Sequence, residues 1–106
     1  MPKFMVRGSY SADGLKGLVR EGGTARRDAI NAAVESAGGT LETFHYGFGE
    51  GDLYAIIDVP DQETMTAIAL AIGASGALAP HTTALLTPEQ VDAAVKKDVK
   101  YRPPGA

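Results

Sequence analysis

The side chains that could do chemistry fall in three short stretches of the chain: Arg7 and Tyr10, His45 and Tyr46, and Asp52 and Tyr54. A histidine beside a tyrosine and an aspartate can transfer protons, since an imidazole titrates near neutral pH and a tyrosine hydroxyl can donate to a developing oxyanion. His45 or Asp52 would act as the base. Tyr54 or Tyr46 would be the hydrogen-bond donor, and Arg7 would anchor an anion.

These residues also have a simpler interpretation. They can bond to one another across an interface between subunits, without any ligand. Asp52 follows a glycine-rich turn, where an aspartate commonly binds backbone amides. The ligand-binding candidates are therefore Arg7, Tyr10, His45 and Tyr54, and both interpretations stay open.

A second candidate is an anion site where a helix is predicted to begin. Gly23, Arg26 and Arg27 combine free backbone amides with two guanidinium groups, which can hold a phosphate or a carboxylate. The pattern is neither a Walker A loop nor a dinucleotide fingerprint. The alternative is ion pairing at a surface or interface, with Glu21 or Asp28 as partner.

The sequence offers little material for a metal or a cofactor. His45 and His81 are the only two histidines, the chain has no cysteine, and the carboxylates are scattered. A zinc or iron site normally needs three or four such ligands close together. We expect no metal and no cofactor, and no serine nucleophile motif is present.

Strand patterns decide which candidates can meet. Alternating or β-branched and aromatic runs predict strands at residues 3–10, 40–48, 52–59 and 80–87, the middle two joined as a hairpin by Gly49-Glu50-Gly51. Neighbouring residues of a strand point to opposite sides, so His45 and Tyr46 cannot share a face. Arg7, Tyr54 and one of this pair can converge on the sheet face away from the helices.

Helices are predicted in the intervals between these strands and after the last one. Thr24, Asp61 and Thr87 are the expected N-caps, and the helices run to Gly38-Gly39, to about Ala74 and to about Asp98. Residues 11–23, with four glycines, predict a turn or a single helical turn. In the last helix Val91, Ala94 and Val95 share one side and are expected to face inward; residues 101–105 form an extended tail.

The order β-α-β-β-α-β followed by a helix predicts an α+β fold of the ferredoxin-like type, with a four-stranded antiparallel sheet plus a C-terminal helix. The chain of 106 residues fits one domain, residues 1–106. Each strand has a second, semi-apolar side, and no charged residue occurs between Thr64 and Pro88. We therefore expect a homo-oligomer, a dimer or an assembly of dimers, in which sheet faces bury each other.

Composition excludes some partners. A net charge of −3 offers no broad basic surface for nucleic acid. Gly73, Gly76 and Pro80 interrupt the uncharged stretch, which argues against a membrane span. The start of the sequence runs directly into a strand pattern, so we expect no cleaved secretory signal and a cytoplasmic location.

The chain resembles the GYD domain family of small bacterial proteins. The resemblance is carried by residues 47–61 and extends to residues 26–28, 38–39, 69–76 and 86–89. The family signature is a glycine, a spacer, a tyrosine and an aspartate, and Gly51 stands here in the place of that tyrosine. The resemblance implies a ferredoxin-like fold of the dimeric α+β barrel kind and implies no particular activity.

The function that these patterns favour is the binding of a small molecule in a cavity between subunits. One alternative is a cofactor-independent oxygenase or isomerase that acts on a small aromatic or carbonyl compound, an idea that rests on fold analogy. Another is a purely structural or regulatory interaction module. A pocket where His45, Arg7 or Tyr54 converge would favour the first two functions.

Overall fold

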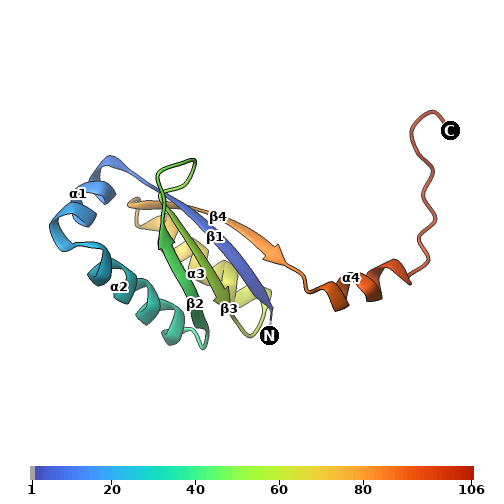
Figure 1. Cartoon of the computed structure of the whole chain (residues 1–106), viewed down its shortest axis with the longest axis horizontal. Coiled ribbons are helices and arrows are strands. Elements are labelled where there is room, and N and C mark those ends of the chain that lie inside the picture. Colours follow the sequence, from blue (N-terminus) through green and yellow to red (C-terminus); the bar gives the residue numbers. More distant parts are fainter. Residues whose placement is uncertain (1) are drawn as a thin grey trace.

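The computed structural model describes residues 2–106 and has the predicted α+β architecture (Figure 1). Its elements are β1 (Lys3–Tyr10), α1 (Ala12–Glu21), α2 (Gly23–Ser36), β2 (Thr40–Tyr46), β3 (Leu53–Asp58), α3 (Gln62–Ala74), β4 (Leu78–Leu85) and α4 (Pro88–Val95). The four strands form one antiparallel sheet in the order β2-β3-β1-β4. The ferredoxin-like arrangement is confirmed.

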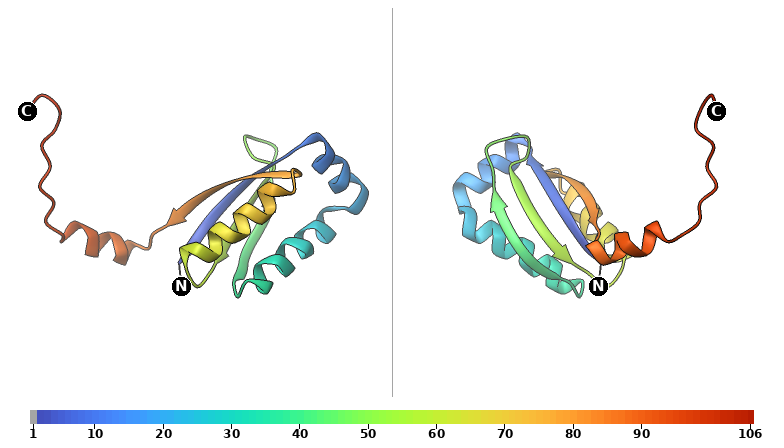
Figure 2. Two further views of the ribbon diagram at one scale, coloured as in Figure 1. Left: turned by 180° about the vertical axis from the view of Figure 1, so that it is seen from behind. Right: turned by 45° about the vertical axis from the view of Figure 1, so that its right-hand side comes forward.

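Helices α2 and α3 lie side by side on one face of the sheet, as both views of Figure 2 show. Alternation along the strands sends Phe4, Val6 and Ile57 into the core between sheet and helices, where they meet Val34 and Met65. None of the helices within residues 2–106 covers the opposite face. We call this face the open face; its central residues are Met5, Arg7, Thr43, His45, Tyr54, Ile56, His81 and Thr83.

The segment after β1 is more helical than predicted. Residues 12–21 form the ten-residue helix α1, in which the Ser11 side chain accepts a hydrogen bond from the backbone N–H of Gly14. Gly14 lowers helix propensity, but a Cβ there would lie 2.1 Å from the carbonyl oxygen of Ala77, so packing requires glycine. Gly22, at φ 88°, separates α1 from α2, and the predicted capping role of Thr24 was wrong.

Two predictions at the C-terminal side were also wrong. β4 begins at Leu78, two residues before the predicted start at Pro80, because Leu78 is buried and pairs with Tyr10 at the end of β1. Helix α4 has the predicted capping box of Thr87 and Gln90, yet it ends at Val95 and does not face inward. Val91 is 46% exposed and Val95 is 75% exposed.

Asp61 caps α3 as predicted and makes the stability of the fold dependent on pH. Its carboxylate accepts hydrogen bonds from the side chain and the backbone N–H of Thr64, and these bonds lower the pKa of Asp61 in the folded protein. The contribution of the ionised form to folding is therefore present above the unfolded-state pKa of about 3.9 and is lost as the pH falls through the lower folded-state value.

We expect the Asp61→Asn variant to lose less stability than the parent protein when the pH is lowered from about 6 to about 3, since asparagine still caps the helix but does not titrate. The measurement is the urea midpoint of both proteins at both pH values. An equal loss in the two proteins would contradict the prediction.

Candidate functional site

Four polar side chains form one row across the open face. Strand register places His45 opposite Tyr54, Tyr54 opposite Arg7, and Arg7 opposite His81, so each strand of the sheet contributes one residue. We call these four residues the polar row. All four side chains can donate hydrogen bonds, which suits a ligand that carries oxygen atoms or negative charge.

Arg7 lies at the centre of the polar row, and only some of its hydrogen-bond donors have a partner. Its Nη1 donates to Glu50 Oε2 at 3.0 Å, but the Glu50 side chain is 86% exposed, so this ion pair is weak. Its Nε is buried and has no hydrogen-bond partner among residues 2–106. A buried donor without a partner costs free energy, and a bound acceptor would remove that cost.

Gly51 packs directly against the polar row. A Cβ at this position would lie 2.4 Å from Cγ of Arg7 and 3.2 Å from Cζ of Tyr54. The backbone N–H of Gly51 also donates to the Tyr54 hydroxyl oxygen at 3.2 Å, which leaves the hydroxyl proton available to another acceptor. The stem of Arg7 therefore occupies the space that a side chain at position 51 would need.

We expect Gly51→Ala to displace Arg7 from its position and to lower the free energy of unfolding by about 1–3 kcal/mol, as overpacked sites generally do. Urea unfolding measures the loss, and the matched control is Gly49→Ala in the same turn, where an added Cβ meets no atom within 4 Å. Equal stabilities of the two variants would show that Gly51 is not constrained.

Next to the polar row, the open face carries a group of apolar side chains and, farther along the strands, a group of ion pairs. Met5 and Ile56 pair across β1 and β3, with Thr43 and Thr83 on the outer strands. Beyond them Lys3 donates to Glu42 and to Asp58 Oδ2, and these carboxylates raise the pKa of Lys3. The second oxygen of Asp58, Oδ1, is buried without a hydrogen-bond partner among residues 2–106.

The remaining candidates from the strands lie elsewhere. Tyr46 points to the helix face, where its hydroxyl donates to the carbonyl oxygen of Gly23 at 2.9 Å. Tyr10 lines the space between α2 and α3, and burial together with the nearby Tyr46 raises its pKa. The carboxylate of Asp52 accepts the backbone N–H of Tyr10 at 2.8 Å. Asp52 thus braces the ends of β1 and β3 and does not join the polar row.

The arginines at the start of α2 are paired with neighbouring acids. Arg26 lies 3.4 Å from Glu21, and Arg27 lies 3.0 Å from Asp28. The carbonyl of Gly23, which precedes them, accepts the Tyr46 hydroxyl. These contacts agree with the ion-pairing alternative for Arg26 and Arg27. The structure also brings His45 to this segment, where it lines a pocket together with Gly23 and Arg27.

His81 is the member of the polar row that sequence reasoning did not place there. In the sequence it stands out only as one of two histidines that could bind a metal, because nothing in the local pattern of residues 80–87 connects it to Arg7. The signal that finds it is the strand order: β1 lies between β3 and β4, so one register brings His81 beside Arg7.

Within residues 2–106, no three histidine or acidic side chains gather where they could hold a metal ion. None of the helices in that same range is both long and apolar enough to cross a membrane.

The chain matches the model of a known protein family. The family model described as GYD domain matches residues 4–95, which runs from the first strand to the end of α4. A search of curated proteins found none that matches the chain.

Proposed function

Since this chain belongs to the GYD domain family, we propose that it acts as a homo-oligomer in which two copies bring their open faces together and bind a small carboxylate at the polar row. The observation that carries the proposal is the position of the two buried polar atoms without partners, Arg7 Nε and Asp58 Oδ1. Both lie on the open face. Atoms of this kind normally have a partner in the functional state.

A second copy of the same chain is the occupant that best fits the open face. The face carries both signs of charge, with Lys3 and Arg7 near the acids Glu42, Glu50 and Asp58. A two-fold interface places each patch against a copy of itself, so a surface with both signs can pair with itself. Met5 and Ile56 in the middle would supply the apolar centre of the interface.

A carboxylate is the ligand class that the polar row suits. Arg7 can bind a carboxylate through two parallel hydrogen bonds, and the exposed Glu50 that it now contacts is easily displaced. The hydroxyl of Tyr54 and the imidazoles of His45 and His81 would add donors on either side. Ile56 beside the row would contact an aromatic or aliphatic body attached to the carboxylate.

Sedimentation and a ligand titration test this function together. We expect the protein to sediment as a dimer or larger at micromolar concentration, and we expect phenylacetate to shift the NMR signals of the His45 and His81 side chains. Phenylethanol, which lacks the carboxylate, is the control and should cause no shift. If the protein is an oligomer but does not bind phenylacetate, the carboxylate site is refuted and a purely structural interaction module is the remaining function. If the protein sediments as a monomer, the proposed assembly is refuted.

Proton transfer on an enolisable carbonyl compound is a second candidate, favoured by the register of His45 beside Tyr54. The imidazole would take a proton from the carbon next to the carbonyl, the Tyr54 hydroxyl would donate to the enolate oxygen, and the proton would return to carbon. Phenylpyruvate in deuterated water tests this. Exchange of its methylene protons should accelerate with the parent protein and not with His45→Asn, which keeps a polar side chain for binding.

A further inference from the structure

Residues 86–106 leave the body of the protein as an extended arm, seen in Figure 1 and in both views of Figure 2. We call them the C-terminal arm. Its large apolar residues are exposed: Leu86, Val91, Val95, Val99 and Tyr101. The buried core, by contrast, lies entirely within β1 to β4. The arm therefore presents apolar surface that its own chain does not cover.

Helix α4 is built to pack against something. Val91, Ala94 and Val95 follow the spacing i, i+3, i+4 and form one apolar stripe, and the capping box of Thr87 and Gln90 fixes where the helix starts. A helix of eight residues is marginal alone in water, so tertiary packing normally supplies its stability. The match to the family model extends to residue 95 and therefore includes α4.

The link between β4 and α4 directs the arm outward. Only Leu86 and Thr87 connect the two elements, and Thr87 has an extended backbone at φ −77° and ψ 158°. Because Pro88 follows, the helical conformation that a tight reversal would need is disfavoured at Thr87. In the structure the stripe of α4 accordingly points away from its own sheet, and Val91 and Val95 stay exposed.

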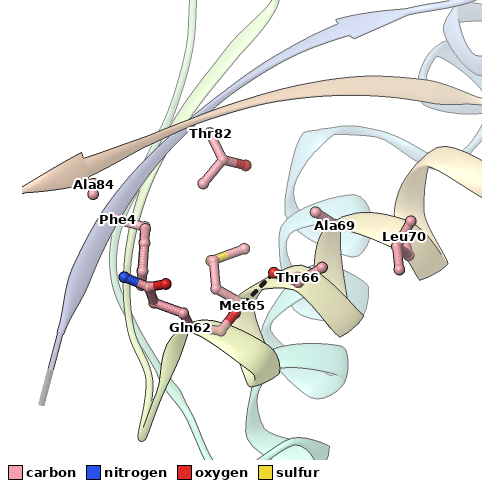
Figure 3. A pocket seen from close by; sticks show the side chains of 8 residues that line it. All are labelled: Phe4, Gln62, Met65, Thr66, Ala69, Leu70, Thr82 and Ala84. Carbon is pink, nitrogen blue, oxygen red and sulfur yellow. Dashed lines mark hydrogen bonds between the residues drawn. The ribbon is translucent and has the colours of Figure 1, made fainter.

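A groove of matching character lies between α3 and the edge strand β4. Its volume is about 440 Å3, and it is lined mainly by Phe4, Met65, Ala69, Leu70, Thr82 and Ala84, with Gln62 and Thr66 from α3. Figure 3 shows the side chains of α3 and those of β1 and β4 facing each other across it. No charged side chain lines the groove, so its surface suits an apolar helix stripe.

We propose that the C-terminal arm of one copy seats its Val91, Ala94 and Val95 stripe in this groove of a second copy. Charge supports a second copy as the occupant. Residues 96–102 hold four cations and one carboxylate, whereas the chain as a whole has a net charge of −3, so the acidic excess belongs to the body. Among residues 2–106, Lys96 and Lys97 have no ion-pair partner, nor does Glu63 in the first turn of α3.

The absence of cysteine makes a cross-linking test direct. Ala94→Cys labels the middle of the stripe and Thr66→Cys the middle of the groove, so the pair reports contact whichever way the helix runs. The two variants are mixed and treated with a short bis-maleimide. We expect about tenfold more cross-linked dimer than from Ala94→Cys mixed with Val19→Cys, because contact raises the effective concentration. Val19 is an exposed position on α1.

Two results would overturn the proposal. One is equal yield from the groove pair and the control pair. The other is an internal cross-link within one chain when Ala94→Cys and Thr66→Cys are combined, which would show that the arm folds onto its own body.

The groove and the open face are on opposite sides of the sheet. Docking of the arm in the groove can therefore be refuted without refuting the pairing of the open faces, and the reverse also holds. The cross-linking yield should be unchanged when Ile56→Asp, which alters only the open face, is added to both variants.

Discussion

Replacing Ile56 by aspartate is expected to separate the paired sheet faces and to convert the oligomer formed through them into its smaller components. Ile56 pairs with Met5 at the centre of the open face. In a two-fold interface the new carboxylate would be buried near the same carboxylate of the second copy. The neighbouring cations Lys3 and Arg7 already pair with acidic side chains of their own chain. An uncompensated buried charge costs about 3–5 kcal/mol, which corresponds to a weakening of association by roughly 100-fold to 4,000-fold.

Sedimentation velocity over a dilution series measures the change for Ile56→Asp. The matched control is Val19→Asp, which makes the same kind of replacement at a position that is 85% exposed on α1. The control should associate as the parent protein does. If Ile56→Asp also sediments as the parent does, the open face is not the interface, and the site at the polar row would have to function within one chain.

Much of the fold follows from local patterns because those patterns agree with the tertiary structure. Asp61 and the Thr87-Pro88 pair begin α3 and α4 as predicted, and the alternation of β1 gives its inward set, Phe4 and Val6. The prediction fails where a distant contact outweighs local propensity. Gly14 argues against a helix by itself, yet the close approach of Ala77 makes glycine the only residue that fits in α1.

The site was partly accessible from the sequence. Strand alternation brings Arg7 and Tyr54 to one face and separates His45 from Tyr46, and the structure then assigns His45 to that face. Register between strands far apart in the chain is not encoded in any local pattern, which is why His81 was missed. The same holds for the packing of Gly51 against Arg7, since only the folded turn brings them together.

The exposed stripe of α4 and the semi-apolar open face share one property, since the sequence pattern of each indicates a buried surface. Local amphipathicity predicts that a surface will be buried, but it does not predict which molecule buries it. Val91 and Val95 were expected to pack inward within the chain, and they are exposed. With the open face on one side of the sheet and the groove on the other, two separate contacts between copies would give an assembly of dimers.

Removing the guanidinium group of Arg7 is expected to abolish most carboxylate binding while leaving the fold intact. In Arg7→Met the unbranched stem that packs on Gly51 is kept, and the buried Nε without a partner is lost with the charge. A hydrogen bond to a charged group contributes about 1.5–3 kcal/mol, so affinity for phenylacetate should fall roughly 10-fold to 150-fold. Removing an unsatisfied buried donor should also leave stability equal or slightly higher.

The two effects in Arg7→Met can be measured separately, by titration with phenylacetate and by urea unfolding. Arg20→Met is the control, since Arg20 is exposed in the last turn of α1 and lies off the open face. It should bind phenylacetate as the parent protein does. Retained affinity in Arg7→Met would remove Arg7 as the anchor of the ligand. A large loss of stability would instead mean that Nε has a partner in the assembled protein, and that the guanidinium group of Arg7 belongs to the subunit interface rather than to a ligand site.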